Sequence, residues 1–98
     1  GLSCEPAEAR TADTLVMETT FGLPRYEFPP TEEVIARVVK FCAEALEDGD
    51  VPVLLGYSLG KAQEILAVLV RAGLPAMLHG TIARIARIYA ESGVDFPE

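Results

Sequence analysis

VPVLLGYSLGKAQEIL, residues 51–66, is the stretch that decides the expected fold of this chain. Its first five residues are apolar and end at Gly56, and a helical pattern of apolar residues follows at once. A short apolar run bounded by glycine is typical of a buried strand, and apolar residues spaced three and four apart are typical of an amphipathic helix. The sequence therefore predicts a strand at residues 51–55, a tight turn, and a helix at residues 60–72.

The same alternation extends to both sides of this stretch. Short apolar runs predict strands at residues 15–17 and 76–79. Helical spacing predicts a helix that Thr31 caps and Gly49 ends, with Glu32 and Glu33 in its first turn, and another helix at residues 81–92. Strands separated by helices imply βαβ units, right-handed crossovers and a short parallel sheet. We therefore expect an α/β fold with three layers, whose sheet continues in a longer chain because three strands rarely form a sheet covered on both faces.

Composition narrows the class of protein. The 98 residues suit one small domain or part of a larger one, and an apolar content of 50% argues against disorder. A net charge of −7 is unfavourable for a chain that binds nucleic acid alone, because such binding neutralises phosphates with Lys and Arg. Contact with nucleic acid must therefore be local, or must use charges from elsewhere in a longer protein.

The two cysteines and the apolar runs indicate a reducing, membrane-free location. Cys4 and Cys42 are too few and too far apart for a disulfide framework, and Cys42 falls on an apolar helix face, where it is expected to be a small buried hydrophobe. No apolar run reaches the roughly 18 residues of a membrane span. We expect a cytoplasmic chain without a membrane partner.

The turn at residues 56–61 allows three interpretations. Its G-x-S-x-G pattern is that of a nucleophile elbow, which would make Ser58 the nucleophile of a serine hydrolase. The catalytic triad of such hydrolases has the chain order Ser, then Asp or Glu, then His, and this sequence does not have that order. A dyad of Ser58 with the single histidine, His79, stays open. Alternatively, Ser58 caps the helix while Gly60 eases the turn, or Lys61 and free backbone N–H groups cradle an anion.

Two motifs resemble one known family. Residues 15–22, LVMETTFG, are similar to the acidic-Ser/Thr-Thr-aromatic-Gly segment at the entry of the β-CASP region in metallo-β-lactamase-fold nucleases. Residues 56–66 are similar to the strand-turn-helix that follows in that family. The loop at residues 21–24 and 28–30 resembles the branch of DNA-ligase-associated exonucleases and mRNA 3′-end-processing factors. The resemblance covers residues 15 to about 93.

This resemblance implies a domain division and a function. Residues 1–22 would end a metallo-β-lactamase-type domain and form an entry strand, and residues 23–98 would be the first part of a Rossmann-like β-CASP domain. The chain would be a fragment of a zinc-dependent nuclease of RNA processing or DNA repair. Such a fragment clamps single-stranded RNA or DNA over a site with two zinc ions.

The resemblance also assigns site residues. Glu18 matches the acidic residue of the first motif and receives a catalytic role in organising the active-site histidines; its alternative is to cap the next turn. Ser58, Gly60 and Lys61 match the turn that faces the nucleic acid and are the expected phosphate-binding residues; the alternative for Lys61 is a solvated helix charge.

The departures from the family pattern limit these roles. The family's His-x-His-x-Asp-His motif is absent, and one histidine cannot supply the ligands of two metal ions. We therefore expect no metal site and no activity in this chain alone, with zinc held by the parent protein. A non-enzymatic α/β module that binds a phosphate compound at residues 56–61 is the main alternative. Arg84 and Arg87 either extend a basic track or are solvated, and exposed sheet edges make a homo-oligomer a further expectation.

Overall fold

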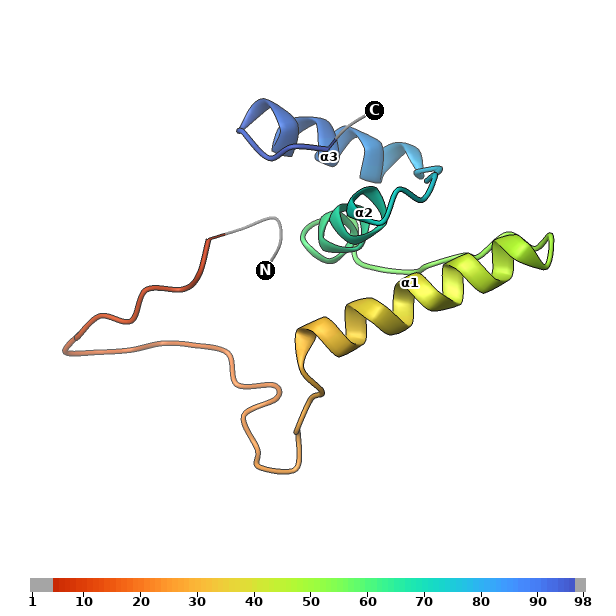
Figure 1. Cartoon of the computed structure of the whole chain (residues 1–98). Helices are drawn as coiled ribbons and strands as arrows, with labels where there is room; N and C mark the ends of the chain where they lie inside the picture. The colour runs from red at the N-terminus through yellow and green to blue at the C-terminus, as the bar shows by residue number, and fades with distance from the viewer. Residues whose placement is uncertain (1–4, 97–98) are drawn as a thin grey trace.

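The computed structural model describes residues 5–96, and the regular structure of these residues consists of three helices (Figure 1). They are α1 (Thr31–Glu47), α2 (Lys61–Arg71) and α3 (Gly80–Glu91). α2 contacts both α1 and α3, whereas α1 and α3 do not contact each other. The short helix α2 is therefore the centre of the packing.

The expected parallel sheet is wrong. Residues 15–17, 51–55 and 76–79 form no strand, and no strand occurs anywhere in residues 5–96. A strand exists only when its backbone groups bond to a neighbouring strand, and no such neighbour is present among these residues. The described chain is helical, so neither the three-layer α/β class nor the Rossmann-like β-CASP portion is supported.

The helices themselves lie where helical spacing predicted them, within about two residues at each end. The predicted cap of α1 is wrong, because the N-cap residue is Pro30 and Thr31 is the first helical residue, without a capping side chain. Two acids, Glu32 and Glu33, still lie in the first turn, where the helix dipole favours them. Gly49 takes a positive φ of 80° just after the helix, which glycine adopts without strain.

The buried core is small and lies at the helix contacts. One residue of α1, three of α2 and one of α3 make up its apolar part: Cys42, Ala62, Leu66, Ala67 and Ala86. Four of these five side chains are small, so the core buries little apolar surface. The prediction that Cys42 is a buried hydrophobe is confirmed, with a free thiol; Cys4 lies outside the described residues.

Much of the chain lies outside this core. The radius of gyration is 16.1 Å, against about 13 Å for a compact domain of this length. Residues 5–30 contain no helix and follow an extended trace away from the three helices (Figure 1). Within it, the ring of Phe21 contacts those of Tyr26 and Phe28, at centroid distances of 5.3 and 5.4 Å. These contacts span the expected domain boundary after residue 22, which stays a prediction.

No helix in the described part of the chain is both long and apolar enough to cross a membrane.

Candidate functional site

The turn that begins α2 is held by a buried amide side chain. Gln63 has no exposed surface, and its side-chain oxygen accepts a hydrogen bond of 2.7 Å from the backbone N–H of Gly60. Its side-chain nitrogen donates a hydrogen bond of 2.9 Å to the backbone carbonyl of Ser58. Because glycine has no side chain, only the Gln63 half of a capping box can form here. Gln63 therefore ties both sides of the turn to the helix.

Three backbone N–H groups at the start of α2 are bonded within the chain. Besides the N–H of Gly60, that of Lys61 donates to the carbonyl of Leu59 at 3.2 Å, and that of Ala62 donates to the carbonyl of Tyr57 at 3.0 Å. An anion would have to displace these bonds to use the three amides. The side chain of Lys61 and the positive end of the helix dipole could bind a phosphate without breaking these three bonds.

Two glycines permit this geometry. Gly60 has a φ of 86°, a conformation that residues with a Cβ rarely adopt. A Cβ on Gly56 would lie only 3.0 Å from Cγ of Lys61 and 3.2 Å from Cδ1 of Ile65. The stem of Lys61 therefore packs over Gly56. The lysine as a whole is exposed, and it also borders a groove of about 230 Å³ between α1 and α2.

Three of the predicted site residues, Ser58, Gly60 and Lys61, lie together in this turn. The prediction that Ser58 caps the helix is wrong, because Gly60 is the N-cap and Ser58 contributes its carbonyl. In the described part of the chain no hydrogen bond joins Ser58 to His79. Instead, Nδ1 of His79 accepts one of 3.3 Å from the N–H of Thr81 and so caps α3. The Ser58–His79 dyad is therefore not formed.

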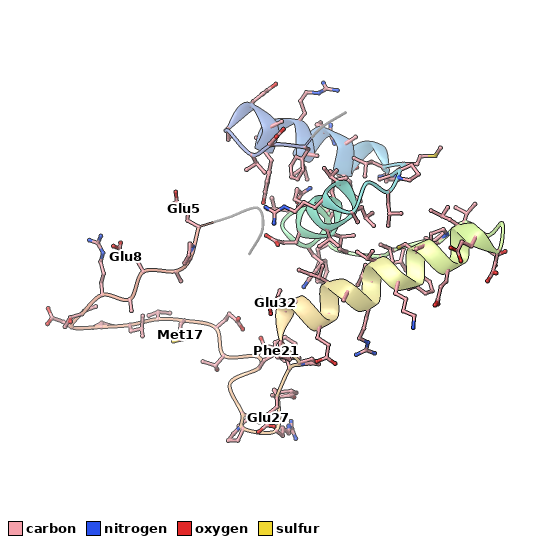
Figure 2. All side chains as sticks on the ribbon, viewed as in Figure 1. Glu5, Glu8, Met17, Phe21, Glu27 and Glu32 are labelled. Atoms are coloured by element: carbon pink, nitrogen blue, oxygen red, sulfur yellow. The ribbon has the colours of Figure 1, made fainter. Side chains whose placement is uncertain are left out.

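Glu18 lies apart from this turn. Its carboxylate accepts a hydrogen bond of 2.8 Å from the backbone N–H of Thr20. Hydrogen bonds from the side chain and backbone of Thr20 hold the pKa of Glu18 below its usual value. Its neighbour Met17 lies on the extended N-terminal trace, well separated from α2 (Figure 2). This geometry agrees with the alternative that Glu18 caps the next turn; its catalytic role stays a prediction.

Other charged and metal-ligating residues do not form a second centre. Within residues 5–96, no group of three or more His, Cys, Asp or Glu side chains could hold a metal ion. The expected zinc ions belong to a longer protein, so their presence stays a prediction. Arg84 and Arg87 are both exposed on α3, as a solvated pair would be.

Sequence reasoning missed the role of Gln63. The sequence assigns it no role beyond a place in the polar first turn of α2, whereas it is the most buried polar residue described. A usable signal was its position three residues after Gly60, because Gln at the third helical position often bonds back to the N-cap amide.

Comparison with known proteins gives one informative relative. The chain is 47% identical over 97 residues to a protein of Opitutus terrae (strain DSM 11246 / JCM 15787 / PB90-1) that is named "Probable DNA ligase". The similarity covers 99% of this chain and 10% of that protein, so the chain spans about a tenth of the relative's length. No family model and no solved structure matches the chain.

These findings correct the functional interpretation. The relative carries the name of a DNA ligase, and the described residues form no strand. The assignment to the metallo-β-lactamase/β-CASP nucleases is therefore wrong, together with the hydrolase, exonuclease and RNA-processing functions that it implied. The α/β phosphate-binding module and the serine hydrolase fail as well, because the sheet that both required is absent from residues 5–96.

Proposed function

We propose that this chain is a non-catalytic module of a DNA-joining polypeptide and that Lys61 gives the module a contact with DNA phosphates. The observation that carries the proposal is the 47% identity to the Opitutus terrae protein, which extends over 99% of this chain. The similarity covers nearly all of this chain and a tenth of the relative. Its simplest explanation is that the two matched regions have the same role inside a longer polypeptide.

The local geometry supports a binding role for Lys61. Its side chain is exposed at the first residue of α2, where the helix dipole is positive. The packing of its stem over Gly56 reduces the freedom of the side chain before DNA arrives. By contrast, Gln63 and His79 are engaged in holding helix starts. The turn therefore supplies one positioned cation.

The charge of the chain sets how this contact acts. With a net charge of −7, the module alone binds DNA weakly, and Lys61 adds to phosphate contacts made elsewhere in the polypeptide. A phosphate contact orients the DNA and carries no base preference. Single-stranded DNA is the partner that we propose at this turn, and comparison with duplex DNA tests it.

The test uses a chimera of the Opitutus terrae protein in which this chain replaces the matched 97 residues. Sealing of nicked DNA is measured over a range of DNA concentrations, next to a version without these residues. We expect the deletion to raise KM and to leave kcat nearly unchanged. A loss of kcat with unchanged KM would contradict a binding module.

Lys61→Ala in the chimera tests the site. Loss of one phosphate contact should reduce the slope of log affinity against log salt by about 0.7 to 0.9. Lys61→Arg should restore the slope. Lys40→Ala is the matched control, because it removes the same charge from α1, where Lys40 lies 3.8 Å from Glu44. Equal effects of the two alanine variants would overturn the role of Lys61.

A further inference from the structure

The stretch between α1 and α2 exposes a row of apolar side chains. Every second residue is involved, with exposed fractions of 83% for Val51, 72% for Val53, 90% for Leu55 and 86% for Tyr57. Pro52 and Leu54, between them, are half-buried. In an extended chain, alternate side chains point to the same side. These four residues, called the apolar stripe below, therefore share one face.

The backbone of this stretch is also without partners. Residues 51–56 make no backbone hydrogen bond to any described residue, and the first such bond after them is the one that Tyr57 accepts from Ala62. Figure 1 shows the stretch as an extended trace between the end of α1 and the start of α2. Exposed apolar side chains beside unpaired backbone groups are the features that a second polypeptide segment covers.

The relative indicates where the covering polypeptide comes from. In the Opitutus terrae protein the matched region is a tenth of the whole, so nine tenths of that polypeptide are available to cover it. A second copy of this chain is a poorer partner, because it would bring another net charge of −7.

The flanking charges indicate the chemistry of the partner surface. Glu47, Asp48 and Asp50 directly precede the apolar stripe, and they favour basic residues on the opposing surface. We propose that the apolar stripe docks on an apolar surface, rimmed by Lys or Arg, in the remainder of the longer polypeptide. The inference rests on the proposed membership of a longer polypeptide; it does not depend on the contact between Lys61 and DNA.

Hydrogen exchange tests this docking in the same chimera. If the apolar stripe is covered, the amides of Val53, Leu54 and Leu55 should exchange at least about tenfold more slowly in the chimera than in the isolated chain. Val53→Asp in the chimera should abolish the slowing. Phe41→Asp is the matched control, since Phe41 is a 53% exposed apolar residue on α1, outside the stripe, and the slowing should persist.

Three other outcomes would overturn the docking, and a fourth concerns Lys61 alone. Equally fast exchange in both proteins would mean that the remainder does not cover the stripe. Slow exchange in the isolated chain that grows with its concentration would identify a second copy as the partner. Loss of slowing in both Asp variants would show that the slowing does not depend on the apolar stripe, and would overturn its docking. Failure of DNA binding with the slowing retained would overturn the role of Lys61 and leave the docking intact.

Discussion

The side-chain oxygen of Gln63 lies 2.7 Å from the backbone nitrogen of Gly60, the residue three positions before it. This bond occupies an amide that a helix start would otherwise offer to an anion. The same side chain holds the carbonyl of Ser58. Gln63 is therefore the internal support of the turn, and Lys61 is its exposed cation.

Replacement of Gln63 by leucine tests this support. Leucine keeps most of the volume and leaves the N–H of Gly60 and the carbonyl of Ser58 without their partner. We expect the free energy of unfolding to fall by about 1 to 3 kcal/mol, measured by urea denaturation and circular dichroism. Arg71→Leu, at an exposed position of the same helix, should change it by less than about 0.5 kcal/mol. Similar values for the two variants would argue against the support.

Two glycine-to-alanine variants separate backbone strain from helix propensity. Gly60→Ala should lower the free energy of unfolding by about 1 to 3 kcal/mol, because alanine is strained at a φ of 86°. Gly80→Ala should be neutral or stabilising by up to about 1 kcal/mol, because an added Cβ meets nothing and Gly80 begins α3. Thermal unfolding of both variants measures the two changes in stability. Destabilisation by Gly80→Ala would contradict the backbone geometry described at that residue.

The thiol of Cys42 should be protected by the fold. Only 3% of Cys42 is exposed, so a thiol reagent should reach it mainly through opening of the structure. In a Cys4→Ser variant, we expect slow labelling in buffer and fast labelling in concentrated urea. Fast labelling in buffer, at the rate seen in urea, would mean that Cys42 is not buried by the fold.

The carboxylate of Glu18 should titrate below its usual value of 4.5, because the hydrogen bonds from Thr20 favour the charged form. The stabilisation of this turn is present above pH 4.5 and is lost as the pH falls through the lower pKa of the folded state. Thr20→Val removes the hydroxyl and keeps the backbone N–H, so the pKa should rise part of the way. NMR titration measures the pKa of Glu18 in the original chain and in the variant. An equal pKa in the two would disprove the contribution of the Thr20 hydroxyl.

The helices could be predicted from the sequence because their hydrogen bonds are local. Apolar spacing in residues 31–47 and 80–91 and the acids of the first turn of α1 each act within a few residues. The cap of α1 was harder to predict, because Thr31 and Pro30 can both begin a helix. Only the backbone shows that Pro30 holds the cap position.

The candidate site could be predicted only in part from the sequence. The positions of Ser58, Gly60 and Lys61 in one turn followed from the glycines around them. The inward direction of Gln63 did not, because its polarity suits solvent as well as a buried bond. A polar residue becomes fully buried only when its partners lie within reach, and those partners are backbone groups that the turn brings close.

The sequence by itself determined three helices, their approximate ends and a turn between residue 56 and the start of α2. The tertiary structure alone decided that residues 51–55 stay unpaired and that Gln63 faces inward. The physical reason is the range of the interactions. In a helix, backbone groups form hydrogen bonds with residues four positions away. An apolar extended segment needs a partner that is distant in the sequence, and the residues of the segment do not show whether that partner is present.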